Sequence, residues 1–390
     1  MAPYYGTDGL CGPFSTPSTE LQPPTHVAFP AHAAIFPGPR RFDRLRPHGF
    51  VSASWGRALN RLFLRLLIGL LLGVAVFVGF AIYADVQSLT AHLESFAWWR
   101  LGPVIGLTLL AYGLRFLKWH YLLCRAEARV PVGRSALVFL AGFSMAITPG
   151  KVGELLKAWL LKATDRIPVT RTAPVVIADR LTDLVALVIL CLLGAFTYVE
   201  DPRFGALLLV CGLMVLAMTA LFASTSAFGW GVRLVARMPL GGRIAPRLSE
   251  IGEPLRLLLR PIPFVATSVF AAVAWLGECL GFYLVLGGLP GVESSLPLAV
   301  FIYAATTVLG ALSFLPGGLG VTEGSMTLLL LRSTSGLTRT GAVAATVLIR
   351  LCTLWLGVVV GLVTLGILRL GTGFRLPAQG TRPPSSDDQQ

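Results

Sequence analysis

The chain has 390 residues, of which 55% are hydrophobic and only 13% are charged, whereas soluble domains average about 25% charged residues. This composition excludes an ordinary soluble domain and indicates that lipid surrounds most of the chain. The formal net charge of +13 does not indicate a nucleic-acid partner, because the Lys and Arg residues lie mostly between apolar segments, as the positive-inside rule requires. The sequence therefore predicts an all-α membrane protein that crosses the bilayer several times.

The N-terminal segment, residues 1–61, is rich in Pro and Gly, lacks a sustained apolar period and ends in a basic cluster. It is predicted to be a disordered cytoplasmic tail. The first apolar segment begins near Leu62, too far from the N-terminus for a cleavable signal peptide, and is expected to remain as a membrane anchor. Residues 371–390 are polar and contain Pro, and are predicted to form a second disordered cytoplasmic tail.

Helices that cross the bilayer need about 20 mainly apolar residues. Six segments meet this requirement and are predicted to be full transmembrane helices: 62–83, 101–123, 175–198, 205–223, 264–286 and 342–368.

Two further apolar segments, 135–147 and 297–315, each end at a Pro-Gly sequence and are followed by a short second apolar segment, 155–161 and 325–331 respectively. A helix that stops inside the membrane can turn back only where protein covers its freed backbone groups. We therefore predict two re-entrant helical hairpins in addition to the six spans.

The basic residues fit this layout with both termini in the cytoplasm. Twenty-two of the 32 Lys and Arg residues would face the cytoplasm and four the outer side, as the positive-inside rule favours. If 135–147 crossed completely, Lys157, Lys162, Arg166 and Arg171 would lie outside. Residues 224–262 contain six arginines among apolar residues and are predicted to lie on the cytoplasmic leaflet; an ordinary cytoplasmic loop is the alternative.

The two hairpins would enter from opposite sides of the membrane, and each precedes a helix with a buried arginine. Pro149 precedes Arg180 by thirty-one residues, and Pro316 precedes Arg350 by thirty-four. This pattern predicts an inverted repeat with halves at about 101–223 and 264–370, joined by the segment 224–262. Transporters of this architecture bind their substrate near the membrane midplane, between the repeats.

Ionisable side chains at membrane depth cost about 2.5–3.5 kcal/mol each and usually face a partner or a water-filled cavity. Asp179 and Asp183 share one helical face, and Arg180 can pair with Asp183. This trio is either a structural ion-pair network or part of a binding site. Glu278 lies in the GxxxG sequence Gly277–Gly281, so helix packing and polar lining are both open to it.

The Pro-Gly breaks are candidate anion sites, because the N-terminus of a helix presents unpaired N–H groups and a positive dipole end. A tight turn is the alternative for either break alone, but the motif occurs twice with a downstream arginine. Arg180 and Arg350 are predicted to lie near each other and to hold an anionic headgroup with the hairpin N–H groups. The complete candidate headgroup site is Pro149, Gly150, Lys151, Gly153, Glu154, Lys157, Asp179, Arg180, Asp183, Pro316, Gly317, Gly318, Gly320, Glu323 and Arg350.

These motifs resemble those of the lysylphosphatidylglycerol synthase transmembrane region, a flippase-like membrane family. The resemblance covers about 62–370 and rests on Pro149-Gly150-x-x-Gly153-Glu154 with Lys157, Asp179-Arg180 followed by Asp183, Pro316-Gly317-Gly318-Leu319-Gly320 with Glu323, and Arg350. The family often has Glu at the position of Asp179 and Arg at that of Lys157. In two-part members this region looks like the lipid-translocating portion, beside a separate soluble synthase domain.

The resemblance implies translocation or binding of an anionic, zwitterionic or polyprenyl-phosphate lipid by a multi-pass protein of the plasma membrane. A secondary transporter of a small anionic solute and a membrane subunit of a lipid-modifying transferase are the alternatives. The expected partners are membrane lipids, with a lipid-synthesising enzyme and a homo-oligomer compatible with the sequence. No catalytic motif, cofactor or metal site emerges, so the chain is not expected to be an enzyme.

Overall fold

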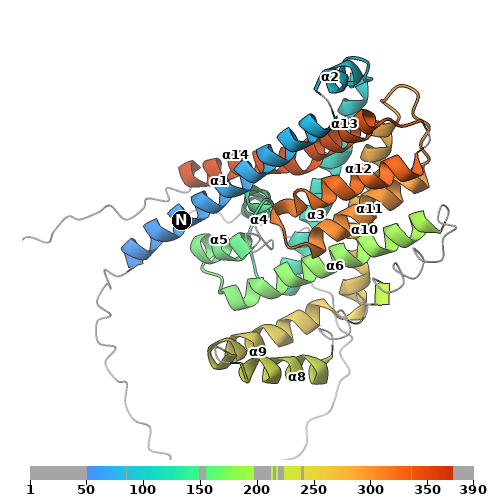
Figure 1. The fold of residues 1–390 in the computed structure, drawn as a ribbon. Helices are drawn as coiled ribbons and strands as arrows, with labels where there is room; N and C mark the ends of the chain where they lie inside the picture. Colours follow the sequence, from blue (N-terminus) through green and yellow to red (C-terminus); the bar gives the residue numbers. More distant parts are fainter. Residues whose placement is uncertain are drawn as a thin grey trace, which may run out of the picture. The chain divides into compact units, whose positions relative to one another are not determined.

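The computed structural model describes residues 51–84, 86–148, 155–196, 212–213, 217, 224–238, 241–334 and 336–371 (Figure 1). The chain divides into two units. One unit consists of Met1–Asn60 together with Leu376–Gln390, and the other is Arg61–Arg375. Within the described ranges all regular secondary structure is helical and no strand occurs, which confirms the all-α class. Most of the two predicted tails, 1–50 and 372–390, lies outside the described residues.

Four helices of the described part are long and apolar enough to cross a membrane: Leu67–Ala84, Trp98–Arg125, Pro261–Leu286 and Arg339–Leu368. They belong to α1 (Val51–Ala84), η1 with α3 (Trp98–Arg100 and Leu101–Arg125), α10 (Pro261–Leu286), and α13 with α14 (Arg339–Arg350 and Leu356–Gly371), which the π-helical turn η5 (Leu351–Trp355) joins. Four of the six predicted spans therefore correspond to such helices. α1 begins at Val51, ahead of the predicted start at Leu62.

The remaining two predicted spans have different outcomes. α6 (Val169–Ala195) covers most of 175–198. It is less apolar than the four helices above because it contains the charged residues Asp179, Arg180 and Asp183. The span 205–223 lies outside the described residues apart from 212, 213 and 217.

Both predicted hairpin regions contain a pair of short helices. The first pair is α4 (Val132–Gly142), continued by η2 (Phe143–Met145), and α5 (Leu155–Asp165). The second is α11 (Leu296–Leu312) and α12 (Val321–Ser333), with η4 (Pro316–Gly318) between them. The two helices of each pair pack against one another.

The second break depends on backbone conformations that L side chains rarely adopt. Gly317, Gly318 and Gly320 have φ angles of 60°, 67° and 83°, in the left-handed region where glycine has no steric penalty. The first break, residues 149–154, lies outside the described residues.

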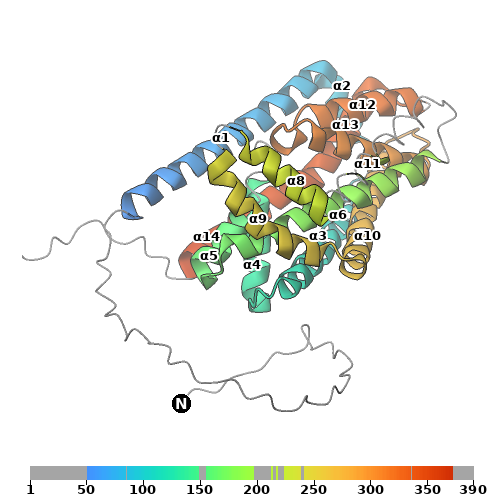
Figure 2. The same cartoon turned by 90° about the horizontal axis from the view of Figure 1, so that it is seen from below.

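The two halves of the helical unit pack reciprocally. α3 packs against α10, α6 packs against α11 of the second pair, and α14 packs against α4 and η2 of the first pair (Figures 1 and 2). Glycines permit both of the latter contacts: a Cβ at Gly194 of α6 would lie 2.7 Å from Phe301 N, and one at Gly361 of α14 would lie 2.7 Å from Phe143 C. Such mutual exchange of contacts is expected of units related by a two-fold axis.

Two apolar clusters form the core. One contains residues from Leu187 onward in α6 together with α10, α11, α12 and α13. The other contains the end of α3, α4, α5 and the residues of α6 between Val175 and Leu181. Cys191, Cys279 and Cys352 are buried in the first cluster, where their small side chains contribute to the packing. The charged residues of α6 thus occur where this helix passes from one core to the other.

The basic segment 224–262 forms α8 (Thr225–Ala236) and α9 (Gly241–Leu258), and continues into the start of α10. α9 packs against α8 and α6 (Figure 2). Trp230 and Leu234 of α8 are exposed, as are Arg233 and Arg237. An exposed face that is both apolar and basic fits a helix at a lipid surface.

Candidate functional site

A cavity of about 150 Å³ lies among α3, α10, α6 and both helix pairs. Its charged lining consists of four cations and two carboxylates: Arg115, Lys157, Arg180, Arg350, Asp183 and Glu278. An engineered protein cavity of about 150 Å³ holds a benzene-sized molecule. The site therefore has room for a phosphate-sized group, but not for a whole lipid.

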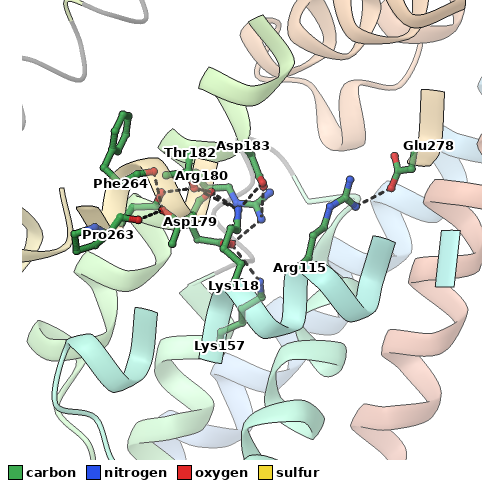
Figure 3. A network of polar contacts seen from close by, with 12 residues as sticks. Arg115, Lys118, Lys157, Asp179, Arg180, Thr182, Asp183, Pro263, Phe264 and Glu278 are labelled. Atoms are coloured by element: carbon green, nitrogen blue, oxygen red, sulfur yellow. Dashed lines mark hydrogen bonds and ion pairs between the residues drawn. The ribbon is translucent and has the colours of Figure 1, made fainter. Parts of the chain in front are cut away.

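Lys118 of α3 forms ion pairs with both aspartates of α6 (Figure 3). Its Nζ lies 2.9 Å from Asp179 Oδ1 and 2.5 Å from Asp183 Oδ1, and it also donates to the Asp179 carbonyl oxygen at 3.0 Å. The Lys118 side chain is completely buried. Because a buried ammonium needs close anionic partners, this contact fixes α3 against α6 at the depth of the cavity.

Arg180 extends from the same aspartates to the cavity. Its Nη2 lies 2.8 Å from Asp179 Oδ2 and 3.0 Å from Asp183 Oδ2, while 32% of its side chain remains exposed. Lys157 of α5 is buried, and its Nζ lies 4.0 Å from Asp179 Oδ2 and 4.6 Å from the Phe139 ring centroid. Asp179 is therefore surrounded by three cations, and of these Lys157 and Arg180 also line the cavity.

Arg350 is tied to the second break. Its Nε forms an ion pair with Glu323 Oε1 at 2.5 Å, and its Nη2 donates to the Gly317 carbonyl oxygen at 2.8 Å. The other Glu323 oxygen accepts the Gly320 N–H at 2.7 Å, which caps the start of α12. Glu323 thus couples the shape of the break to the position of Arg350.

Two glycine N–H groups at this break are hydrogen-bonded within the turn. The Gly318 N–H donates to the Leu315 carbonyl oxygen, and the Gly320 N–H donates to Glu323. Arg350, at the end of α13, adds a positive charge beside this turn.

Two residues of the cavity lining, Arg115 and Tyr303, were not singled out in the sequence. Arg115 of α3 forms an ion pair with Glu278 of α10, with 2.8 Å between Nη1 and Oε1 (Figure 3). Tyr303 of α11 donates its hydroxyl to the other Glu278 oxygen at 2.7 Å. The Arg115 guanidinium also lies 4.0 Å from the ring centroid of Trp275, a cation–π contact. Of the two roles open to Glu278, polar lining of the cavity is the one that these contacts support.

The predicted site residues fall into four groups. Those that line the cavity are Lys157, Arg180, Asp183, Gly317, Gly318 and Arg350. Asp179 and Glu323 hold the arginines through ion pairs. Pro316 and Gly320 shape the second break. Those outside the described residues are Pro149, Gly150, Lys151, Gly153 and Glu154.

Lys157 had also been counted among the basic residues of a cytoplasmic loop. It is 1% exposed, so it belongs to the cavity and not to the loop. When Lys157 is left out of the count, the predicted cytoplasmic side still has a large excess of basic residues over the outer side.

Arg115 and Lys118 were missed as site residues. They lie three positions apart and hence on one face of a helix, the same signal that pointed to Asp179 and Asp183. Among the described residues no group of three or more His, Cys, Asp and Glu side chains is placed to hold a metal ion.

Fold and site together define a multi-pass helical membrane protein with a charged cavity between two helix-pair units. The chain belongs to the family of the lysylphosphatidylglycerol synthase TM region, whose family model matches residues 67–361. A UPF0104 membrane protein of Methanothermobacter thermautotrophicus is 25% identical over 264 residues, covering 62% of this chain and 77% of that protein. A UPF0104 membrane protein of Pyrococcus horikoshii is 26% identical over 249 residues, covering 57% and 73%.

Proposed function

We propose that this protein is a flippase-like lipid transporter that binds the anionic headgroup of a membrane lipid in the cavity and carries it between leaflets. The observation that carries the proposal is the placement of Arg180 and Arg350, from corresponding helices of the two halves, on the lining of one cavity. Arginine is suited to this role because its planar fork matches two oxygens of a phosphate.

The charge balance supports an anionic ligand. Arg115, Lys157, Arg180 and Arg350 outnumber the two carboxylates of the lining. When the three residues behind the lining, Lys118, Asp179 and Glu323, are added, the described cluster still contains one more basic than acidic side chain. A buried charge without a partner is costly, so a phosphate in the cavity would stabilise the arrangement.

The helix lengths support re-entrant pairs in an inverted repeat. At about 1.5 Å per residue, the 11 residues of α5 and the 13 of α12 reach about 16 and 20 Å, less than the roughly 30 Å hydrocarbon core. The reciprocal packing of the halves supports the two-fold relation. Both termini would lie in the cytoplasm, with α8 and α9 on the cytoplasmic leaflet of the plasma membrane.

The cavity volume supports a carrier that encloses only the headgroup of a lipid. The headgroup phosphate would enter the charged site, while the acyl or polyprenyl tails stay in the bilayer. Membrane lipids are therefore the proposed ligands, with no catalytic step. A transporter of a small anionic solute is the rival, because a free anion would also fit the cavity.

Reconstitution into liposomes with fluorescent anionic phospholipids tests the proposal. Purified wild-type protein should equilibrate the lipid between leaflets, and Arg180→Gln and Arg350→Gln should lose this activity. Because Arg350→Gln leaves the Glu323 carboxylate buried without its cation, the charge-balanced Arg350→Gln/Glu323→Gln should also be tested. Arg332→Gln is the matched control, since Arg332 is an exposed arginine of α12, the helix that contains Glu323, and is not part of the cavity lining.

Each outcome has a definite meaning. Loss of lipid movement in variants that remain monodisperse in detergent supports the proposal, provided that Arg332→Gln is active. Normal lipid movement by well-folded Arg180→Gln and Arg350→Gln variants would remove both residues from the site. Uptake of inorganic phosphate without lipid movement would favour the solute transporter.

A further inference from the structure

The wall formed by α3 and α10 presents hydrogen-bond donors without acceptors. Within the described part of the chain, Arg115 Nε, Arg115 Nη2 and Trp275 Nε1 are buried atoms with no hydrogen-bond partner. Both oxygens of the neighbouring Glu278 are already engaged, one by Arg115 Nη1 and the other by the Tyr303 hydroxyl. The unmet requirement of this wall is therefore for acceptor oxygens alone.

The geometry of the free edge of Arg115 is specific. Nε and Nη2 form one edge of the guanidinium, and their N–H bonds point the same way, so that they match two oxygens of a phosphate. The ion pair with Glu278 uses the opposite nitrogen, Nη1. Glu278 and the Trp275 ring thus hold the guanidinium without using its bidentate edge.

The free edge of the Arg115 guanidinium is buried, and a buried donor needs an acceptor. Arg115 is only 9% exposed although it lines the cavity, and buried donors are satisfied in nearly all native proteins. Water does not reach Nε or Nη2 in the structure described. A ligand would therefore engage the edge only together with a shift of the side chains that close this wall.

We propose that Arg115 and Trp275 form an oxyanion subsite that binds phosphate oxygens of the ligand held by Arg180 and Arg350. This inference deepens the proposed function and rests on it. Three guanidiniums from α3, α6 and α13 would then surround one phosphate group. Arg115 acts as a binding residue in this arrangement, and Glu278 positions it.

Binding of short-chain lipids to the full chain in detergent, measured by isothermal titration calorimetry, tests the subsite. The probes are dioctanoylphosphatidic acid, dioctanoylglycerol, which has the same tails without the phosphate, and inorganic phosphate. Arg115→Lys keeps the charge but lacks the planar fork. Arg115→Gln/Glu278→Gln removes the fork while keeping the wall neutral and leaving an acceptor for Tyr303.

The matched control is Arg125→Lys. Arg125 lies on the same helix and also contacts an aromatic ring, that of Tyr121 at 5.4 Å, but it is exposed and is not part of the cavity lining.

Both Arg115 variants should bind dioctanoylphosphatidic acid about ten-fold more weakly or worse, as expected for the loss of charge-assisted hydrogen bonds, and Arg125→Lys should match wild type. Dioctanoylglycerol should bind equally weakly to all. Wild-type affinity in either Arg115 variant would overturn the subsite while leaving the proposed function standing. A wild-type protein that binds neither phosphate probe would overturn both.

The titration with inorganic phosphate shows whether the phosphate that binds belongs to a lipid or is a free anion. If inorganic phosphate binds with the same dependence on Arg115 and dioctanoylphosphatidic acid binds no better, the subsite holds and its ligand is a free anion. A clear preference for the lipid phosphate supports the subsite as part of a lipid carrier.

Discussion

Replacing Gly361 by alanine should separate the two halves of the helical unit. Gly361 lies where α14 approaches η2, and a Cβ there would come 2.7 Å from Phe143 C and 2.9 Å from Ser144 Cα. These are backbone atoms that cannot rotate away, so the new methyl group must push α14 and the first helix pair apart. Overpacking of this kind costs about 1–3 kcal/mol.

Gly366 supplies the matched control because it lies on the same helix and a Cβ there would meet nothing within 4 Å. Both substitutions of glycine by alanine increase the helix propensity by the same amount, up to about 1 kcal/mol. The difference in unfolding free energy between the two variants therefore reports the cost of the clash alone. Gly194→Ala should behave like Gly361→Ala, because its Cβ would lie 2.7 Å from Phe301 N in the reciprocal contact.

The measurement is reversible unfolding in mixed micelles, followed by far-ultraviolet circular dichroism. Gly361→Ala should unfold with a free energy about 1–3 kcal/mol below that of Gly366→Ala. Equal stability of the two variants would refute the close approach of α14 to the first helix pair. A loss in Gly361→Ala without one in Gly194→Ala would refute the reciprocity of the packing.

Two further predictions concern the buried charges and the second helix pair. Lys118→Met should lower the free energy of unfolding by about 3–5 kcal/mol because it leaves buried carboxylates without their cation, and Lys118→Met/Asp183→Asn should recover part of this loss; thermal denaturation in detergent checks both, and no recovery would contradict the pairing. Cysteines at Glu293 and Arg332 should label from the same side of the membrane in vesicles, while one at Leu315, in the turn, should resist a bulky impermeant maleimide from the opposite side. Labelling of Leu315 from that side would show that the pair crosses the membrane completely.

The elements that were predictable from the sequence are those for which lipid sets the length. The spans near 62–83 and 264–286 could be read from apolar composition because a bilayer requires about 20 such residues. The second helix break was predictable because Pro and Gly interrupt an apolar pattern in only a few ways. α1 extends further toward the N-terminus than its apolar part does, since a helix can continue beyond the membrane where composition no longer marks it.

The partners of the buried charges were less predictable. The pair Arg180–Asp183 is local in sequence and was anticipated, and the structure contains it at 3.0 Å. The pairs of Lys118 with Asp183 and of Arg115 with Glu278 join different helices, and a single sequence contains no signal for which distant charges meet. Local contacts at the second break were also not predicted, since the Gly318 and Gly320 N–H groups find acceptors within the turn.

The π-helical turn Leu351–Trp355 gives the last long helix two different faces. An α-helix turns by about 100° per residue, so one extra residue in a single turn rotates everything after it by about that angle relative to what precedes it. Arg350 can therefore line the cavity while Gly361, beyond the turn, faces the backbone of Phe143 and Ser144. The π-helical turn thus sets the direction in which the side chains after it point. Deleting one residue within it would keep the helix continuous but rotate Gly361 away from the first helix pair.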